Sequence, residues 1–383
     1  MPRFPEHAPS LAAMKGSIYS AFAPRLRTFE GETYPLHIGD TWMEPARGCR
    51  MQDFTVADHP GMHRYTTVHG HVGLLEATAA RVASRTGIRT TTDNVLITAG
   101  ATGGLSACVG ALLRPGDEVL ILAPHWPLIA GIVRTFHGKP VQVPFIGDVF
   151  DRESAFACVR EAISARTVAV YVNTPNNPTG TVLPVDQLEG VVEAARAADL
   201  WLLSDEVYED YVYQGSHTYL RTLAPERTLS AYSFSKAFGM TGNRVGYVVG
   251  PEDTVAAARK VSTHLYYSTP TASQLAAVAA LEGPGDAWVS RARRLYADMG
   301  ARAAARLGVP APQGSTFLFV DVSEHLDDSG LTGFLERCVA RGLLVAPGTS
   351  FGPYPNHIRV CFTSAEPDRG DRGFEELAKL LGR

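Results

Sequence analysis

Short apolar runs alternate with amphipathic segments through the middle of the chain, and this alternation limits the fold more than any other feature. Strands are expected at 94–100, 117–126, 139–145, 167–175, 200–208 and 228–235, and helices at 104–114, 127–138 and 185–199. Strands that alternate with helices form a mostly parallel, doubly wound sheet with helices on both faces. We therefore predict an α/β fold in which ligands bind beyond the carboxyl ends of the strands.

A second, smaller α/β unit is expected at the end of the chain. A long arginine-rich helical stretch covers 286–308, and the strand candidates 316–322, 343–348 and 357–363 follow it. We predict that residues 1–45 form an N-terminal segment that packs with this unit. Residues 46–285 would form the large domain, and residues 286–383 a small C-terminal domain entered through the long helix.

Composition excludes several classes of protein. A net charge of −4 and a pI near 6.3 argue against a protein that mainly binds nucleic acid or an anionic membrane. The five cysteines show no paired spacing, which is typical of free thiols in a reducing compartment. No signal peptide and no apolar run of about 18 residues is visible, so we expect a cytoplasmic protein. His69 and His71 lack further ligands nearby, and no metal site is predicted.

Polar residues gather where the expected strands end. The turn NTPNNPTG covers 173–180, and Asp205 follows an apolar run in LSDEVY, with Tyr208 three positions on. The stretch SFSKAFGMTGNRVG covers 233–246 and contains Lys236, one of only five lysines. A tight turn and a helix cap are the simpler explanations for the first two features.

One ligand could use all of these strand ends. Gly100, Ala101 and Thr102 lie at a strand-to-helix turn, where backbone N–H groups favour a phosphate. A buried carboxylate keeps a ring nitrogen protonated, and a lysine captures an aldehyde as a Schiff base. Pyridoxal 5′-phosphate carries a phosphate, a basic ring nitrogen, a phenolic oxygen and an aldehyde, and it is the cofactor that we predict.

The motifs also resemble those of a known family. The pattern S-x-S-K-x-x-G-x-x-G-x-R-x-G is matched in full at 233–246, and NNPTG and DEVY occur in the family's order. From about residue 30 to its end, the chain resembles the fold type I, class I/II pyridoxal-phosphate-dependent aminotransferases. This resemblance implies a large domain with a mostly parallel mixed sheet and a smaller α/β C-terminal domain.

The resemblance also assigns roles to individual residues. Lys236 matches the Schiff-base lysine, Asp205 the partner of the ring nitrogen, and Tyr208 and Asn177 the partners of the ring hydroxyl. The phosphate site corresponds to Gly100, Ala101, Thr102, Ser233, Ser235 and Arg244, and Trp126 to the ring stacked on the cofactor. Tyr65 resembles a tyrosine that reaches the phosphate of the neighbouring subunit, which implies a homodimer with shared active sites. Arg359 in HIRVCFT corresponds to the clamp for the substrate carboxylate, since its planar guanidinium can donate two parallel hydrogen bonds.

These roles imply a ping-pong transfer of an amino group from an L-amino acid to a 2-oxo acid. Lys236 would carry the proton that leaves the substrate α-carbon. A lyase on the same scaffold, either a C–S β-lyase or a cyclopropane-forming enzyme, shares these cofactor residues and stays open as an alternative. A non-catalytic regulatory module is a more remote one, disfavoured by the acidic balance.

The substrate is expected to be aromatic or otherwise neutral and bulky. Gly39 and Trp42 lie in the entry segment LHIGDTWMEP and are expected to contact the substrate, with Asn177 and Arg359. Aspartate-specific family members carry an arginine near the segment that corresponds to THLYYSTP (263–270). Here that segment offers His264 and no arginine. His125 could add a polar wall beside Trp126.

Overall fold

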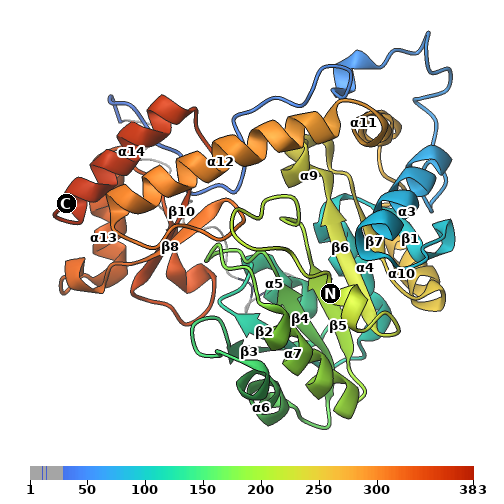
Figure 1. The fold of residues 1–383 in the computed structure, drawn as a ribbon, viewed down its shortest axis with the longest axis horizontal. Helices are drawn as coiled ribbons and strands as arrows, with labels where there is room; N and C mark the ends of the chain where they lie inside the picture. The colour runs from blue at the N-terminus through green and yellow to red at the C-terminus, as the bar shows by residue number, and fades with distance from the viewer. Residues whose placement is uncertain (1–10, 12–13, 15–28) are drawn as a thin grey trace, which may run out of the picture.

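The computed structural model describes residues 29–383 and, ahead of them, Leu11 and Met14. Its centre is a seven-stranded sheet with the order β1-β7-β6-β5-β4-β2-β3 (Figure 1). In that order the strands are β1 (Val95–Thr98), β7 (Gly246–Val249), β6 (Thr228–Ser233), β5 (Trp201–Asp205), β4 (Thr167–Asn173), β2 (Glu118–Ala123) and β3 (Lys139–Pro144).

Strand direction confirms the predicted mixed, mostly parallel sheet. The five strands from β6 to β3 pair in parallel, and β7 runs antiparallel to both β1 and β6. Every residue of β2 is buried, as is usual for a parallel strand that is covered on both faces. The strand β7 was not among the expected strands, because it is short and lies directly behind the lysine motif.

Helices cover both faces of this sheet. Alternate residues of β2 enter opposite cores: Ile121 packs in one hydrophobic cluster and Leu120 in another. The first core includes side chains of α4 (Gly100–Leu112), α5 (Pro127–Thr135) and α10 (Glu252–Leu265). The second includes side chains of α6 (Arg152–Ala162), α7 (Val185–Ala197) and α8 (Leu220–Leu223). A third cluster joins α3 (Val72–Thr86) and α11 (Thr271–Glu282) to the β1 side, close to the short helix α9 (Phe234–Ala237).

A smaller antiparallel sheet forms the other end of the molecule. Its order is β8-β10-β9, with β8 (Phe317–Asp321), β10 (His357–Cys361) and β9 (Ala346–Pro347). Its helices are α12 (Gly285–Leu307), α13 (Gly330–Val339) and α14 (Pro367–Leu380). Figure 1 shows α12 running across the molecule from α11 to α14. Short 3-10 helices are η2 (Met51–Asp53), η3 (Thr92–Asn94), η4 (Thr241–Asn243), η5 (Ser323–His325) and η6 (Gly348–Ser350).

The start of the described chain packs with this smaller sheet. Tyr34 and Leu36 are buried in its core, and the Cys361 N–H donates to the Leu36 carbonyl at 2.7 Å. The predicted domain boundaries stay a prediction. The part of 1–45 that precedes residue 29 lies outside the described residues, apart from Leu11 and Met14.

Residues 38–43, which we call the crossing segment, connect the two sheets. The Thr363 hydroxyl donates to the Asp40 carbonyl at 2.7 Å from the side of the small sheet. The Thr241 hydroxyl donates to the Asp40 carboxylate at 2.9 Å from the side of the large sheet. The crossing segment therefore passes over the carboxyl ends of the central strands. No helix in the described part of the chain is long and apolar enough to cross a membrane.

Candidate active site

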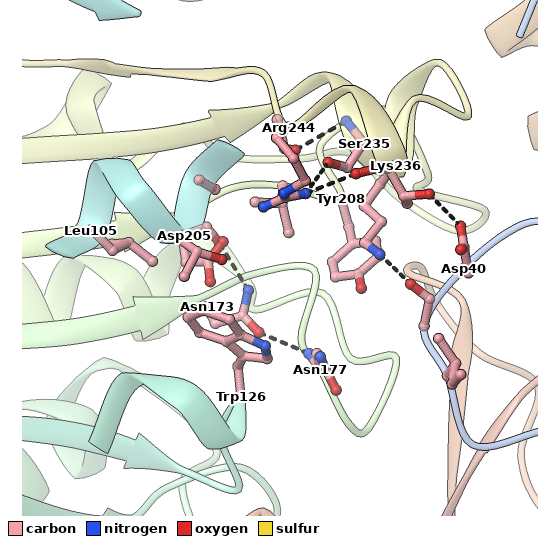
Figure 2. A pocket seen from close by; sticks show the side chains of 17 residues that line it. Asp40, Leu105, Trp126, Asn173, Asn177, Asp205, Tyr208, Ser235, Lys236 and Arg244 are labelled. Carbon is pink, nitrogen blue, oxygen red and sulfur yellow. Dashed lines mark hydrogen bonds between the residues drawn. The ribbon is translucent and has the colours of Figure 1, made fainter. Parts of the chain in front are cut away.

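A cavity of about 280 Å³ opens at the carboxyl ends of β4, β5 and β6, beneath the crossing segment (Figure 2). Eleven of the predicted site residues line it: Gly39, Ala101, Thr102, Trp126, Asn177, Asp205, Tyr208, Ser233, Ser235, Lys236 and Arg244. The structure thus brings together residues that are up to 205 positions apart in the sequence (39 to 244).

Asp205 is the last residue of β5 and is 3% exposed. The Tyr171 hydroxyl donates to its Oδ2 at 2.6 Å, whereas its Oδ1 is buried and has no hydrogen-bond partner. Burial raises the pKa of the Asp205 carboxyl to about 6, although the hydrogen bond from Tyr171 lowers it. This carboxylate can accept one further hydrogen bond from a cationic donor in the cavity.

Lys236 lies on α9, immediately after β6. The helix begins where the Ser233 side chain, at the N-cap, accepts a hydrogen bond from the Ser235 N–H at 3.0 Å. The Lys236 amine donates to the Gly39 carbonyl in the crossing segment. Burial lowers the pKa of the Lys236 amine, which favours the neutral form that a nucleophile requires.

Donors suited to a phosphate gather at the start of α4. Ala101 and Thr102 lie in the first helical turn, where backbone N–H groups lack partners within the helix. Arg244 adopts φ +51°, and its Nη1 lies 2.8 Å from the Thr241 carbonyl and 3.5 Å from the Ser235 hydroxyl. Gly100 is not a lining residue, but a Cβ at its position would lie 2.5 Å from Nη2 of Arg244.

Two asparagines connect the strand ends. Asn173 donates to the Asp205 carbonyl at 2.9 Å and accepts the Asn177 N–H at 2.8 Å, so it holds both residues at the cavity. Tyr208 is 2% exposed and packs edge-on against Phe317, with 5.7 Å between the ring centroids. Burial raises the pKa of its phenol well above the usual range, so the hydroxyl stays protonated.

Arg359 lies on β10, behind the residues that line the cavity. Its Nη1 donates to Asn177 Oδ1 at 2.8 Å, and its Nη2 donates to the His37 carbonyl at 2.6 Å. The guanidinium also lies 4.2 Å from the ring centre of Phe317 and 4.7 Å from that of Phe351. These contacts hold the plane of the guanidinium in one orientation.

The other predicted residues lie in different surroundings. Trp126 caps α5 and lines the cavity, while Trp42 packs against the core of the small sheet and does not line it. Tyr65 is 84% exposed and lies outside the cavity. His125 is buried beside Trp126, and His264 is exposed near the end of α10.

Several lining residues were not predicted: Ile38, Asp40, Leu105, Asn173, Val207 and Thr241. Asn173 opens the NTPNNPTG turn, so its place at a strand end was a usable signal. Tyr171 sits two residues earlier on β4, where it reads as an ordinary apolar strand position. Its contact with Asp205 depends on the register of β4 against β5, which pairs Asn173 with Asp205.

These residues fit pyridoxal 5′-phosphate. The free Oδ1 of Asp205 would accept a hydrogen bond from the protonated ring nitrogen, and the Lys236 amine lies in the same cavity. Trp126 would cover the ring, and Tyr208 and Asn177 would reach its hydroxyl. The phosphate would be held by Ser233, Ser235, Arg244 and the first turn of α4. The described residues contain no group of three or more His, Cys, Asp or Glu that could hold a metal ion.

Comparison with known proteins supports this fit. A family model described as aminotransferase class I and II matches residues 41–373. A probable aspartate/prephenate aminotransferase of Thermus aquaticus is 36% identical over 84% of this chain and 83% of its own length. The arginine–pyruvate transaminase of Pseudomonas aeruginosa is 34% identical over 81% of this chain and 80% of its own. The solved structure of a Thermus thermophilus aspartate aminotransferase tetra mutant in complex with tryptophan superposes with a TM-score of 0.88. It is 31% identical, and the match covers 99% of this chain and 100% of that one.

Proposed function

The chain belongs to the class I and II aminotransferases, which are transaminases dependent on pyridoxal 5′-phosphate, and we propose that its amino-acid substrate carries a neutral, bulky, preferably aromatic side chain. The observation that carries this proposal is the charge of the cavity wall. Among the described residues the only lining cations are Lys236 and Arg244, and both are needed for the cofactor. Arg359 lies behind these lining residues and is assigned to the α-carboxylate, so a second substrate carboxylate would find no further cation among the described residues that line the cavity.

Apolar groups at the entrance favour the same substrate class. Ile38 lines the cavity and is 52% exposed, so its side chain is available to a ligand. Asp40 follows in the crossing segment and adds negative charge. Burying an aromatic side chain against such a surface is favourable, whereas a carboxylate would lose its hydration without gaining a partner.

The relatives' names support a second candidate. The Thermus aquaticus relative is named for aspartate and prephenate, which favours a dicarboxylic amino acid as a substrate here as well. The tryptophan complex of the Thermus thermophilus tetra mutant shows an aromatic amino acid bound to a protein of this fold. Both substrates fit a ping-pong enzyme, because such an enzyme accepts one amino acid in each direction.

In this proposal each residue has a defined task. Arg359 holds the substrate α-carboxylate through parallel hydrogen bonds, and the Lys236 amine takes the proton from the α-carbon. Asp205 would accept a hydrogen bond from the ring N–H of the cofactor and so keep the ring nitrogen protonated, and Tyr208 and Asn177 would orient the ring. When bound, pyridoxal phosphate supplies an electron-withdrawing ring that stabilises the negative charge developing on the α-carbon.

A homodimer with shared sites is part of the proposal. Tyr65 packs edge-on against Tyr267, which is 46% exposed, with 4.9 Å between their centroids. Gln274 fixes the loops that carry both rings, because it accepts the His71 N–H at 2.7 Å and donates to the Thr269 carbonyl at 2.8 Å. Two exposed rings on fixed loops are suited to contacting the site of a second copy of the chain.

The five cysteines are free, in keeping with a reducing compartment such as the cytoplasm.

A panel of amino donors tests the substrate proposal. The holoenzyme is mixed with single amino acids in the absence of an oxo acid, and the change in cofactor absorbance is followed in a single turnover. We expect phenylalanine, tyrosine or tryptophan to react faster than alanine. Aspartate is included to test the second candidate, a dicarboxylic amino acid. Reaction with aspartate alone would contradict the neutral-substrate proposal. Release of pyruvate, ammonia and a thiol from an added cysteine conjugate, without formation of pyridoxamine phosphate from any donor, would instead support the C–S lyase alternative.

The dimer is tested with mixed subunits. Lys236→Ala and Tyr65→Phe chains are mixed, and cofactor binding is compared with that of each variant alone. In the mixed dimer, one site combines the intact lysine with the intact tyrosine of its neighbour. Recovery of tight binding in about half of the mixed sites supports sharing, and no recovery in a proven mixed dimer contradicts it.

A further inference from the structure

A tyrosine on β4 holds the carboxylate that faces the cofactor ring. Tyr171 is fully buried, and its hydroxyl donates to Asp205 Oδ2 at 2.6 Å. Tyr171 and Asn173 are two positions apart on one strand, so both side chains leave the same face of the sheet. Asn173 binds the backbone of Asp205 at 2.9 Å, and Tyr171 binds its side chain. The strand β4 therefore fixes both the backbone and the side chain of Asp205.

The direction of this hydrogen bond is set by its surroundings. Burial raises the pKa of the Tyr171 phenol well above its usual range, so the phenol keeps its proton and donates it. A carboxylate that accepts this bond is favoured over the protonated acid, which counteracts the effect of burial. The second oxygen, Oδ1, remains buried and without a partner. A buried carboxylate oxygen of this kind is costly unless a ligand satisfies it.

We propose that Tyr171 is a positioning residue that fixes Asp205 with one oxygen aimed at the cofactor's ring nitrogen and keeps that carboxylate ionised. By occupying Oδ2, the phenol leaves a single acceptor for the ring N–H. By stabilising the ionised form, it makes Asp205 a weaker base, so the shared proton stays on the ring nitrogen. A protonated ring is the stronger electron acceptor, and the tyrosine thus acts on the chemistry through Asp205.

The simpler role of Tyr171 is packing. Its ring belongs to the hydrophobic core between the sheet and α4, and phenylalanine would fill nearly the same volume. A packing role predicts that loss of the hydroxyl changes stability alone. The positioning role predicts a change at an atom of the cofactor, which the tyrosine itself does not touch. These two roles are therefore separable by experiment.

The test removes the hydroxyl and observes the ring nitrogen. Tyr171→Phe is reconstituted with pyridoxal phosphate labelled with nitrogen-15 in the ring, and the nitrogen chemical shift is measured by NMR. The matched control is Tyr213→Phe, which removes a phenol that donates to the Ser315 carbonyl at 2.5 Å, outside the residues lining the cavity. We expect Tyr171→Phe to move the shift towards the unprotonated value and to weaken cofactor binding about tenfold. A tenfold change is about 1.4 kcal/mol, close to one hydrogen bond to a charged group. Tyr213→Phe should change neither quantity.

A double-mutant cycle keeps the test decisive if Tyr171→Phe is also less stable. The dissociation constant of pyridoxal phosphate is measured for Tyr171→Phe in the background of Asp205→Ala. If the tyrosine acts through the carboxylate, its loss should cost less than about twofold there. Three results would overturn the proposal: an unchanged nitrogen shift, a loss of affinity equal to that of the control, or a tenfold loss that persists without Asp205. None of these measurements needs a substrate, so the outcome is independent of which amino acid the enzyme uses.

Discussion

Replacing Gly100 by alanine should weaken cofactor binding by a route that the structure makes explicit. Gly100 begins α4 with φ +68°, a conformation that residues with a Cβ rarely adopt. An added Cβ would lie 2.5 Å from Nη2, 3.2 Å from Cζ and 3.5 Å from Nη1 of Arg244. The guanidinium would have to move, and it is the lining cation beside Ser235 that would face the phosphate.

Two separate costs follow from this geometry. The left-handed backbone conformation costs about 1–2 kcal/mol with alanine, and this cost should appear in the free energy of unfolding. Displacing the guanidinium removes a hydrogen bond to a charged group, about 1.5–3 kcal/mol, and this cost should appear in cofactor binding. The dissociation constant of pyridoxal phosphate should therefore rise roughly tenfold to a hundredfold.

A second glycine provides the control for the backbone cost. Gly87 caps α3 with φ +69°, and a Cβ there would meet nothing within 4 Å. Gly87→Ala should therefore lose similar stability and keep the wild-type cofactor affinity. In the assay, each apoenzyme is titrated with pyridoxal phosphate, and binding is measured from the quenching of tryptophan fluorescence. The reasoning fails if Gly100→Ala binds with the wild-type constant, or if Gly87→Ala loses affinity to the same degree.

Three further predictions concern stability and substrate binding. Because burial raises the pKa of Asp205 to about 6, ionising this group opposes folding, and apoenzyme stability should fall as the pH rises from about 4 to 6. Asp205→Asn should remove this loss of unfolding free energy, on the order of 3 kcal/mol, when urea unfolding is measured at pH 4 and pH 6. The same dependence of unfolding free energy on pH in variant and wild type would refute the prediction. Phe317→Leu should raise KM several-fold, since it removes a ring that lies against Arg359, the arginine that we propose binds the substrate, whereas Phe374→Leu in the same core should not. Arg85→Ala should cost about 3 kcal/mol, because it removes the ion pair of the buried Glu209 and one of the two ion pairs of Asp210, which keeps Arg81. Arg152→Ala, with exposed ion pairs, should cost under about 1 kcal/mol, and equal midpoints in urea would contradict both estimates.

The sequence was most informative where chemistry coincides with a strand end. Lys236, Asp205 and Asn177 each follow an apolar run, and the alternation of strands and helices predicted that such ends meet at one edge of a sheet. The structure places all three around one cavity. For these residues, the local sequence pattern was enough to predict their position at the site.

Contacts that depend on register or direction could not be predicted in this way. Tyr171 reads as one apolar residue in TVAVYVN, and only the pairing of β4 with β5 brings its hydroxyl to Asp205. The antiparallel direction of β7 has no signal in a run of four buried residues. Trp42 lies in the entry segment LHIGDTWMEP, from which contact with the substrate is predicted, and the sequence gives no signal that its ring packs on the core of the small sheet.

The crossing segment also bears on the order in which the molecule folds. Tyr34 bridges Leu343, and Thr363 binds Asp40, so these pairs close loops of more than 300 residues. Closing such loops costs more entropy than any contact within the central sheet, and they should form late. A nascent chain can therefore complete its seven-stranded sheet before the crossing segment is fixed over the cavity. The contact of Thr363 with Asp40, which holds the crossing segment from the side of the small sheet above the amine of Lys236, should form last.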